Sequence, residues 1–131
     1  MAVELAKLTG DYPLRGSRLD AYLLDVTFTT NGANAPSGVS PAITGLTVAR
    51  SATGTYTLTF AEALKPNKVL VGLAQVQGDE PDLWAKVVSY DKSTGVATVK
   101  VYQNSAGTIA AADTSSKAVK VLLVCSRSSR A

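Results

Sequence analysis

The chain has 131 residues, with 13 Lys and Arg, 10 Asp and Glu and no His. This length predicts a single domain whose core can fold without disulfides or metals. The lack of His excludes an ordinary Ser-His-Asp triad and the common zinc sites. Charged residues make up 18% of the chain, against roughly 25% in a typical soluble domain.

The low charge has two interpretations. Either another copy or another protein covers part of an apolar surface, because weakly charged exposed surfaces tend to associate, or Ser and Thr hydroxyls wet the surface without charge. We favour the first interpretation, and the second stays open.

The bulk sequence also limits the partners. The net charge is +3 and no stripe of Lys and Arg interleaved with aromatics appears, so we expect no binding to nucleic acid. The longest apolar runs fall far short of the roughly 20 residues that span a bilayer, so we expect no membrane partner. The N-terminus does not resemble a secretory signal peptide, which predicts synthesis in a cytoplasm.

The single Cys125 is predicted to be a buried hydrophobe rather than a reactive thiol.

Residues 1–20 differ from the rest of the chain. Gly10, Pro13 and Gly16 interrupt any longer element in this segment. Burial of its large apolar side chains would offset only part of the free-energy cost of ordering its backbone. We therefore hypothesise an extended arm that is loose in the isolated chain and orders against a neighbour; the alternative is a strand or loop packed on its own domain. The side chains expected to bind the partner are Val3, Leu5, Leu8, Tyr12, Leu14, Arg15, Arg18 and Leu19.

Residues 21–131 are predicted to form one all-β domain. The predicted strands are 21–29, 43–50, 54–60, 68–77, 83–90, 96–103 and 117–127. Residues 30–41 are predicted to be a long loop and 110–112 a shorter one. Gly54 and Gly95 are each predicted to close a hairpin with a positive φ. This pattern predicts an antiparallel β-sandwich of jelly-roll or Greek-key type with about seven to eight strands. Both faces of the last strand are apolar, which predicts a central strand or one under a subunit contact.

Two groups of side chains could bind a ligand. Asp79, Glu80 and Asp82 could gather a Ca²⁺ ion, but their spacing matches no known calcium loop and a solvated turn explains them better. Trp84 with Tyr90 and the nearby acids could stack on a sugar ring, whereas the simpler interpretation places Trp84 in a core or an interface. No spacing nominates a pair of catalytic carboxylates, and no pattern predicts a cofactor or a metal. We therefore expect no enzyme.

Several stretches of the body together resemble small virion proteins of tailed bacteriophages with double-stranded DNA genomes. They are Thr53–Phe60, Ala85–Asp91 with Ser93–Gly95, Thr98–Val99, Ala111–Asp113 and Val119–Val124. The pattern is similar to the β-sandwich decoration, or cement, proteins of the phage head and covers roughly residues 43–127.

This resemblance implies a virion protein on the capsid surface. Such a protein binds the outside of the head, commonly as a homotrimer, and clamps neighbouring subunits of the major capsid protein. The alternative from the residues themselves is a tail or fibre-tip module that binds host carbohydrate through Trp84, Tyr90 and the 79–82 acids.

Overall fold

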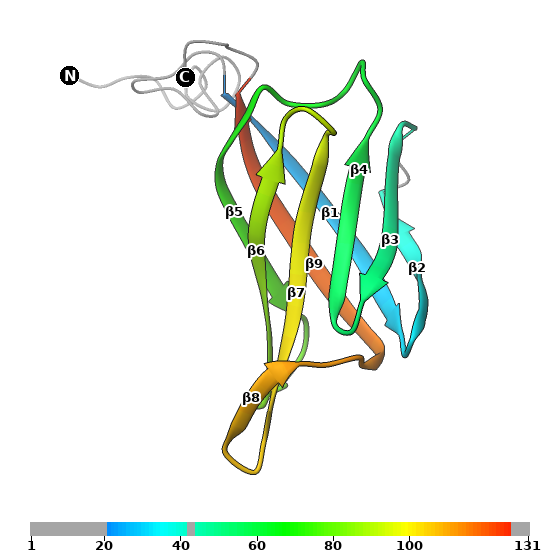
Figure 1. Ribbon diagram of the computed structural model, residues 1–131, viewed down its shortest axis with the longest axis vertical. Helices are drawn as coiled ribbons and strands as arrows, with labels where there is room; N and C mark the ends of the chain where they lie inside the picture. Colours follow the sequence, from blue (N-terminus) through cyan, green and yellow to red (C-terminus); the bar gives the residue numbers. More distant parts are fainter. Residues whose placement is uncertain (1–20, 42–43, 127–131) are drawn as a thin grey trace, which may run out of the picture.

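The computed structural model describes residues 21–41 and 44–126, and these residues contain nine β-strands and no helix. Figure 1 labels the strands and shows one sheet in front of the other. Their bounds are β1 Ala21–Asn31, β2 Asn34–Ser40, β3 Leu46–Ala52, β4 Thr55–Phe60, β5 Lys68–Val76, β6 Leu83–Asp91, β7 Val96–Ser105, β8 Thr108–Ala111 and β9 Ser115–Ser126.

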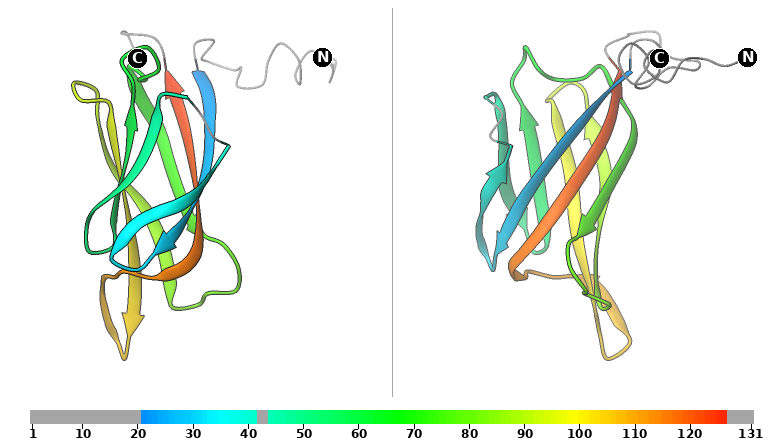
Figure 2. Two further views of the ribbon diagram at one scale, coloured as in Figure 1. Left: turned by 90° about the vertical axis from the view of Figure 1, so that its right-hand side faces the viewer. Right: turned by 180° about the vertical axis from the view of Figure 1, so that it is seen from behind.

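The strands form a β-sandwich, as predicted. One sheet has the order β2-β1-β9-β5, and the other has the order β3-β4-β7-β6 with β8 paired to β7. Every pairing is antiparallel. Figure 2 shows the two layers edge-on in its left view. The last strand returns to lie beside the first, which is a feature of Greek-key connections.

The core lies between the two sheets and follows the alternation of the strands. In β4, Tyr56, Leu58 and Phe60 point inward, as the sequence predicts. Phe28 of β1 packs against Tyr56 with ring centroids 5.1 Å apart, so this aromatic pair joins the two sheets. Cys125 is also fully buried, and burial raises the pKa of its thiol to about 11, which confirms the prediction of a buried hydrophobe.

β9 is a central strand, as predicted from its two apolar faces. It pairs with β1 on one side and β5 on the other. Its inward residues Val119, Val121 and Leu123 are fully buried. Its outward residues Leu122 and Val124 remain partly exposed.

Two predicted loops are wrong, because both contain strands. Residues 34–40 form β2, which pairs with β1 after a turn at Gly32. β2 is an edge strand with two register shifts, and such a strand tolerates Pro36 and Gly38.

Residues 108–111 form β8, which continues the second sheet as a hairpin with β7. Ala106 and Gly107 turn this hairpin with φ values of 52° and 86°, a turn geometry that short hairpins favour.

An ion pair fastens the β3–β4 hairpin to the segment before β9. Two of the three nitrogens of the Arg50 side chain, Nε and Nη2, donate to the carboxylate of Asp113, at 2.9 and 2.7 Å. The amide of Gly54 donates to the same carboxylate at 2.9 Å. The hydrogen bonds from Arg50, followed by that from Gly54, lower the pKa of Asp113 below its ordinary value. Asp113 therefore favours the folded state above its unfolded pKa, and this contribution is lost as the pH falls through its folded pKa.

The Tyr56→Phe variant is expected to raise the free energy of unfolding by up to about 1 kcal/mol. The Tyr56 hydroxyl is buried and has no hydrogen-bond partner among the residues that the structure describes. Removing an unsatisfied hydroxyl takes away a desolvation cost and leaves the ring contact with Phe28 in place. Urea unfolding of both proteins measures the change. A loss of more than about 1 kcal/mol would show that the hydroxyl makes a favourable interaction in the folded protein.

Candidate functional site: the outer face of the four-stranded sheet

The outer face of the sheet β2-β1-β9-β5 carries a contiguous group of aliphatic side chains. Residues in register across β1, β9 and β5 place Leu23 beside Val124 and Val124 beside Val71. In the next row, Leu122 lies beside Leu73. The exposed fractions are 51% for Leu23, 48% for Val71 and 57% for Leu73. We call these residues the outer patch: Leu23, Val71, Leu73, Leu122 and Val124.

A β-bulge in β5 produces part of this patch. The register shifts between Val69 and Val71, so Leu70 is an extra residue in the strand. Val69 pairs with the buried Cys125, whereas Val71 and Leu73 pair with the outward-facing Val124 and Leu122. The bulge therefore turns Val71 and Leu73 to the outside. The right view of Figure 2 shows β1, β9 and β5 running side by side on this face.

Polar groups border the outer patch. Asp25 shares a row with Leu122, and its carboxylate pairs with Lys120 at 3.0 Å, both side chains being nearly half exposed. Thr27 and Gln75 flank Lys120 in the following row. An aliphatic centre with a polar rim is the composition of a protein-docking surface.

The outer face of the other sheet is built differently. Thr55, Thr57 and Thr59 alternate with the buried residues of β4, and Thr98 lies beside Thr57 in β7. Hydroxyls thus cover part of this face, and Lys100 of β7 lies beside both Thr55 and Lys86 on it. Among the described residues, hydroxyls are therefore most frequent on the second sheet, and the aliphatic outer patch lies on the sheet that contains β9.

Trp84 lies on the outer surface of the second sheet and is 37% exposed. Its ring stacks on Tyr102, which is its partner across β6 and β7, with centroids 6.1 Å apart and an angle of 23°. Tyr102 has no sequence signal that links it to Trp84, because only the strand register places the two residues side by side. The observed aromatic pair is therefore Trp84 with Tyr102.

Tyr90 does not share a face with Trp84. A register shift between Val87 and Ser89 turns the end of β6, so that Tyr90 packs against the core. Its ring contacts Phe60 edge-on at 6.3 Å, and its hydroxyl donates to the carbonyl of Pro66 at 2.6 Å. Burial, followed by its neighbours, raises the pKa of Tyr90 to about 12. The predicted pairing of Trp84 with Tyr90 in a sugar platform is wrong.

The three acids of the 79–82 turn do not converge. Asp79 and Asp82 are exposed, while Glu80 forms an ion pair with Lys117. Within residues 21–41 and 44–126, no three carboxylate or thiol groups lie close enough together to hold a metal ion. The turn with exposed charges agrees with the interpretation that the sequence favoured.

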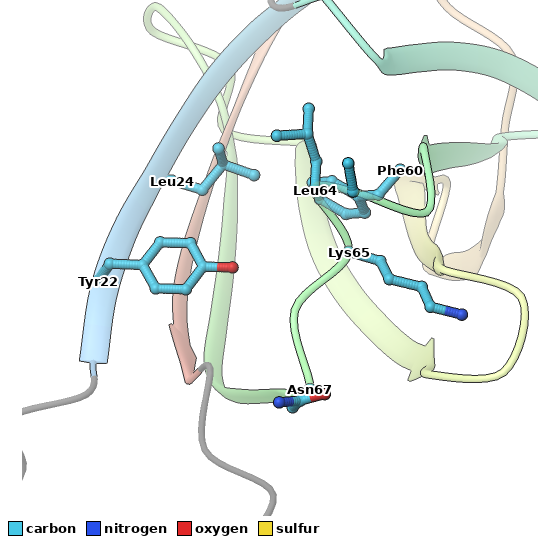
Figure 3. A pocket seen from close by; sticks show the side chains of 7 residues that line it. Tyr22, Leu24, Phe60, Leu64, Lys65 and Asn67 are labelled. Carbon is cyan, nitrogen blue, oxygen red and sulfur yellow. The ribbon is translucent and has the colours of Figure 1, made fainter.

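A cavity of about 210 Å³ opens between the two sheets at the end of the sandwich where β1 begins. Figure 3 shows Tyr22 and Leu24 of β1 facing Phe60 and Leu64 across this space. Among the described residues that line the cavity, Lys65 is the one with a charge, and its ammonium pairs with Glu62 at 3.0 Å. The cavity is small and mostly apolar, so it suits a single aliphatic side chain better than a polar substrate.

The residues predicted for the arm, from Val3 to Leu19, lie outside the described residues. In the part of the chain that the structure describes, no helix has the length and apolarity needed to cross a membrane. No family model, no curated protein and no solved structure matches this chain.

Proposed function

We propose that this protein is a non-enzymatic virion subunit, a capsid decoration protein that docks onto the major capsid protein of a tailed phage. The observation that carries the proposal is the outer patch. Aliphatic side chains gathered on a sheet face, with polar groups around them, have the composition of the centre of a protein-docking surface. The resemblance of residues 43–127 to phage head proteins supplies the kind of partner.

The patch and the arm have separate roles in this proposal. The outer patch supplies the apolar centre of the contact with the coat, and residues 1–20 extend the contact to neighbouring coat subunits. Self-association as a homotrimer would place several such contacts on one particle site. Weak contacts repeated around a shell stabilise it through avidity.

Leu73→Asp is expected to weaken binding to phage heads at least about tenfold, because a carboxylate would be buried without a partner. Leu73 is the most exposed residue of the outer patch. Co-sedimentation of the purified protein with heads of the phage that encodes it measures the effect. The matched control is Ile109→Asp, because Ile109 is 62% exposed on β8 and lies outside the patch.

The comparison between these two variants decides the role of the patch. Circular dichroism should show that both variants keep the fold. If Leu73→Asp decorates heads as well as the Ile109→Asp control, the outer patch is not the docking surface. A deletion of residues 2–18 tests the arm separately, and normal decoration by that variant would remove the arm from the contact.

The stacked pair Trp84 and Tyr102 supports a second candidate, a tail or fibre-tip module that binds host carbohydrate. Exposed aromatic faces are common platforms for sugar rings. Trp84 is the only Trp of the chain, so its fluorescence reports on this site alone. For this candidate, a binding sugar on a glycan array quenches the fluorescence, and Trp84→Ala abolishes binding without unfolding. A glycan array without any bound sugar would contradict it.

A further inference from the structure

The outer patch is smaller than a stable contact between proteins. An outward side chain on a sheet covers about 6.6 Å along the strand and 4.8 Å across it, so the five side chains of the patch span roughly 160 Å². A stable contact between two proteins buries about 800 Å² on each partner. A partner that docks onto the patch must therefore also cover a neighbouring surface of the sandwich.

The neighbouring surface on the β5 side is a groove between the two sheets. In the described part of the chain, β5 and β6 each pair with a single strand, so each forms an edge of its sheet. Figure 1 shows the two strands next to each other at one side of the sandwich. They touch at Gly72, where an added Cβ would lie 2.7 Å from a methyl carbon of Val87. Beside this contact, a groove of about 390 Å³ opens toward the turn after β6.

The groove adjoins the outer patch along β5. Gly72 lines the groove and lies between Val71 and Leu73 of the patch in the strand. The aliphatic character continues, since Val69 and Val88 also line the groove and Val88 is 46% exposed. A segment of the partner that crosses the patch therefore meets further aliphatic side chains where it passes over the edge of the sheet.

The two edges are irregular at the groove, which decides how an occupant binds. Register shifts interrupt β5 between Val69 and Val71, and β6 between Val87 and Ser89. Such edges do not offer the continuous ladder of amides and carbonyls that another strand would extend. Side-chain contacts and charge therefore hold the occupant, and it does not join either sheet as an added strand.

The charge of the groove favours an acidic occupant. Lys68 and Lys92 line it and are exposed, and none of the described residues in its lining is an Asp or a Glu. Neither lysine forms an ion pair with another residue that the structure describes. The carboxylate of Asp91, next to Lys92, accepts hydrogen bonds from the amide and hydroxyl of Ser93 within its own turn, at 2.9 and 2.7 Å. The two ammonium groups are thus complementary to carboxylates on a partner.

We infer that the docking face continues from the outer patch into the groove between β5 and β6, and that an extended acidic segment of the major capsid protein fills this groove. The inference rests on the proposed function, because the groove and the patch bind the same partner. Aliphatic side chains of the segment pack on Val69 and Val88, and its carboxylates pair with Lys68 and Lys92. These charge pairs orient the subunit on the coat, while the outer patch supplies the apolar centre of the contact.

Lys68→Glu with Lys92→Glu is expected to weaken binding to phage heads at least about tenfold, because the double variant sets like charges against each other in the contact. The matched control is Lys86→Glu with Lys100→Glu, which changes the net charge equally at residues of β6 and β7 that do not line the groove. Co-sedimentation with heads measures the effect, and circular dichroism should show that both variants keep the fold. Equal binding by the two double variants would overturn the inference.

Two variants of Val88 test the sign of the charge on the occupant. Val88→Glu and Val88→Lys both remove the aliphatic side chain from the groove, and they add opposite charges. Val88→Glu is expected to bind heads at least about tenfold more weakly than Val88→Lys, because its carboxylate would face those of the occupant. Equal binding by the two variants, or weaker binding by Val88→Lys, would show that the occupant is not acidic.

Zero-length cross-linking on decorated heads identifies the occupant directly. A carbodiimide joins an amine to a carboxylate that touches it, forming an amide with loss of water, and mass spectrometry locates the bond. Lys68 and Lys92 should be joined to Asp or Glu of the major capsid protein, and Lys100 should not. Bonds from Lys68 and Lys92 to acids of their own chain or of a second copy would overturn the assignment of the occupant. No more bonds from these two lysines than from Lys100 would overturn it as well.

Binding to heads separates failure of the inference from failure of the proposed function. If Leu73→Asp blocks binding while the Lys68→Glu/Lys92→Glu protein binds like its control, the groove is not part of the contact and docking through the patch stands. If Leu73→Asp also binds like its own control, docking through the patch is wrong as well.

Discussion

Gly54→Ala is expected to lower the free energy of unfolding by about 3 kcal/mol or more, since left-handed backbone strain alone costs about 1–2 kcal/mol. Gly54 has a φ of 59°. A Cβ at this position would lie 2.6 Å from the amide nitrogen of Ala112 and 2.8 Å from the carbonyl oxygen of Val101. Both neighbours are backbone atoms, so relief would require the β3–β4 hairpin to move away from β7 and from the segment after β8.

Gly32→Ala is the matched control for this prediction. Gly32 has the same φ of 59°, but its Cβ would meet only the hydroxyl of Ser115, at 3.4 Å. The control should therefore show the conformational cost alone, about 1–2 kcal/mol. Urea unfolding of both variants measures the difference. Equal losses in the two variants would show that the backbone contact at Gly54 is unimportant.

Phe28→Ala is expected to destabilise the protein by about 3–5 kcal/mol, the range for removing a buried aromatic ring. Phe28 is fully buried and faces the other sheet, and the centroid of its ring lies 5.1 Å from that of Tyr56. Its removal opens a cavity between the sheets at their main aromatic contact.

Ile109→Ala serves as the control for the Phe28 variant, because it removes a side chain that is 62% exposed. Its expected cost is below about 1 kcal/mol. Thermal unfolding followed by circular dichroism compares both variants with the unaltered protein. A loss below about 2 kcal/mol for Phe28→Ala would contradict the assignment of this ring to the centre of the core.

The sequence predicts the sandwich because its central strands carry clear patterns. The alternation of Tyr56, Leu58 and Phe60 identifies a strand with one buried face, and the apolar faces around Leu122 identify a central strand. The same patterns do not predict β2 and β8, because the sequences of these strands are rich in Asn, Gly, Ser, Pro and Ala. These segments are strands because they pair with β1 and β7, and local propensity does not reveal such pairing.

The candidate site was predictable only in part, because two bulges change which residues face outward. The extra residue Leu70 turns Val71 and Leu73 to the surface, and the shift after Val87 turns Tyr90 to the core. A strict alternation of inward and outward side chains along the strand assigns residues beyond each bulge to the wrong face of the sheet. The stack of Trp84 on Tyr102 likewise depends on the register between β6 and β7.

Electron cryomicroscopy of the native phage particle tests the proposal that the sandwich docks onto the head through its outer patch. We expect density for the sandwich on the outside of the head, with Leu23, Leu73 and Val124 turned toward the major capsid protein. A head without this density, or a sandwich whose β1, β9 and β5 face the solvent, would show that the proposed docking is wrong.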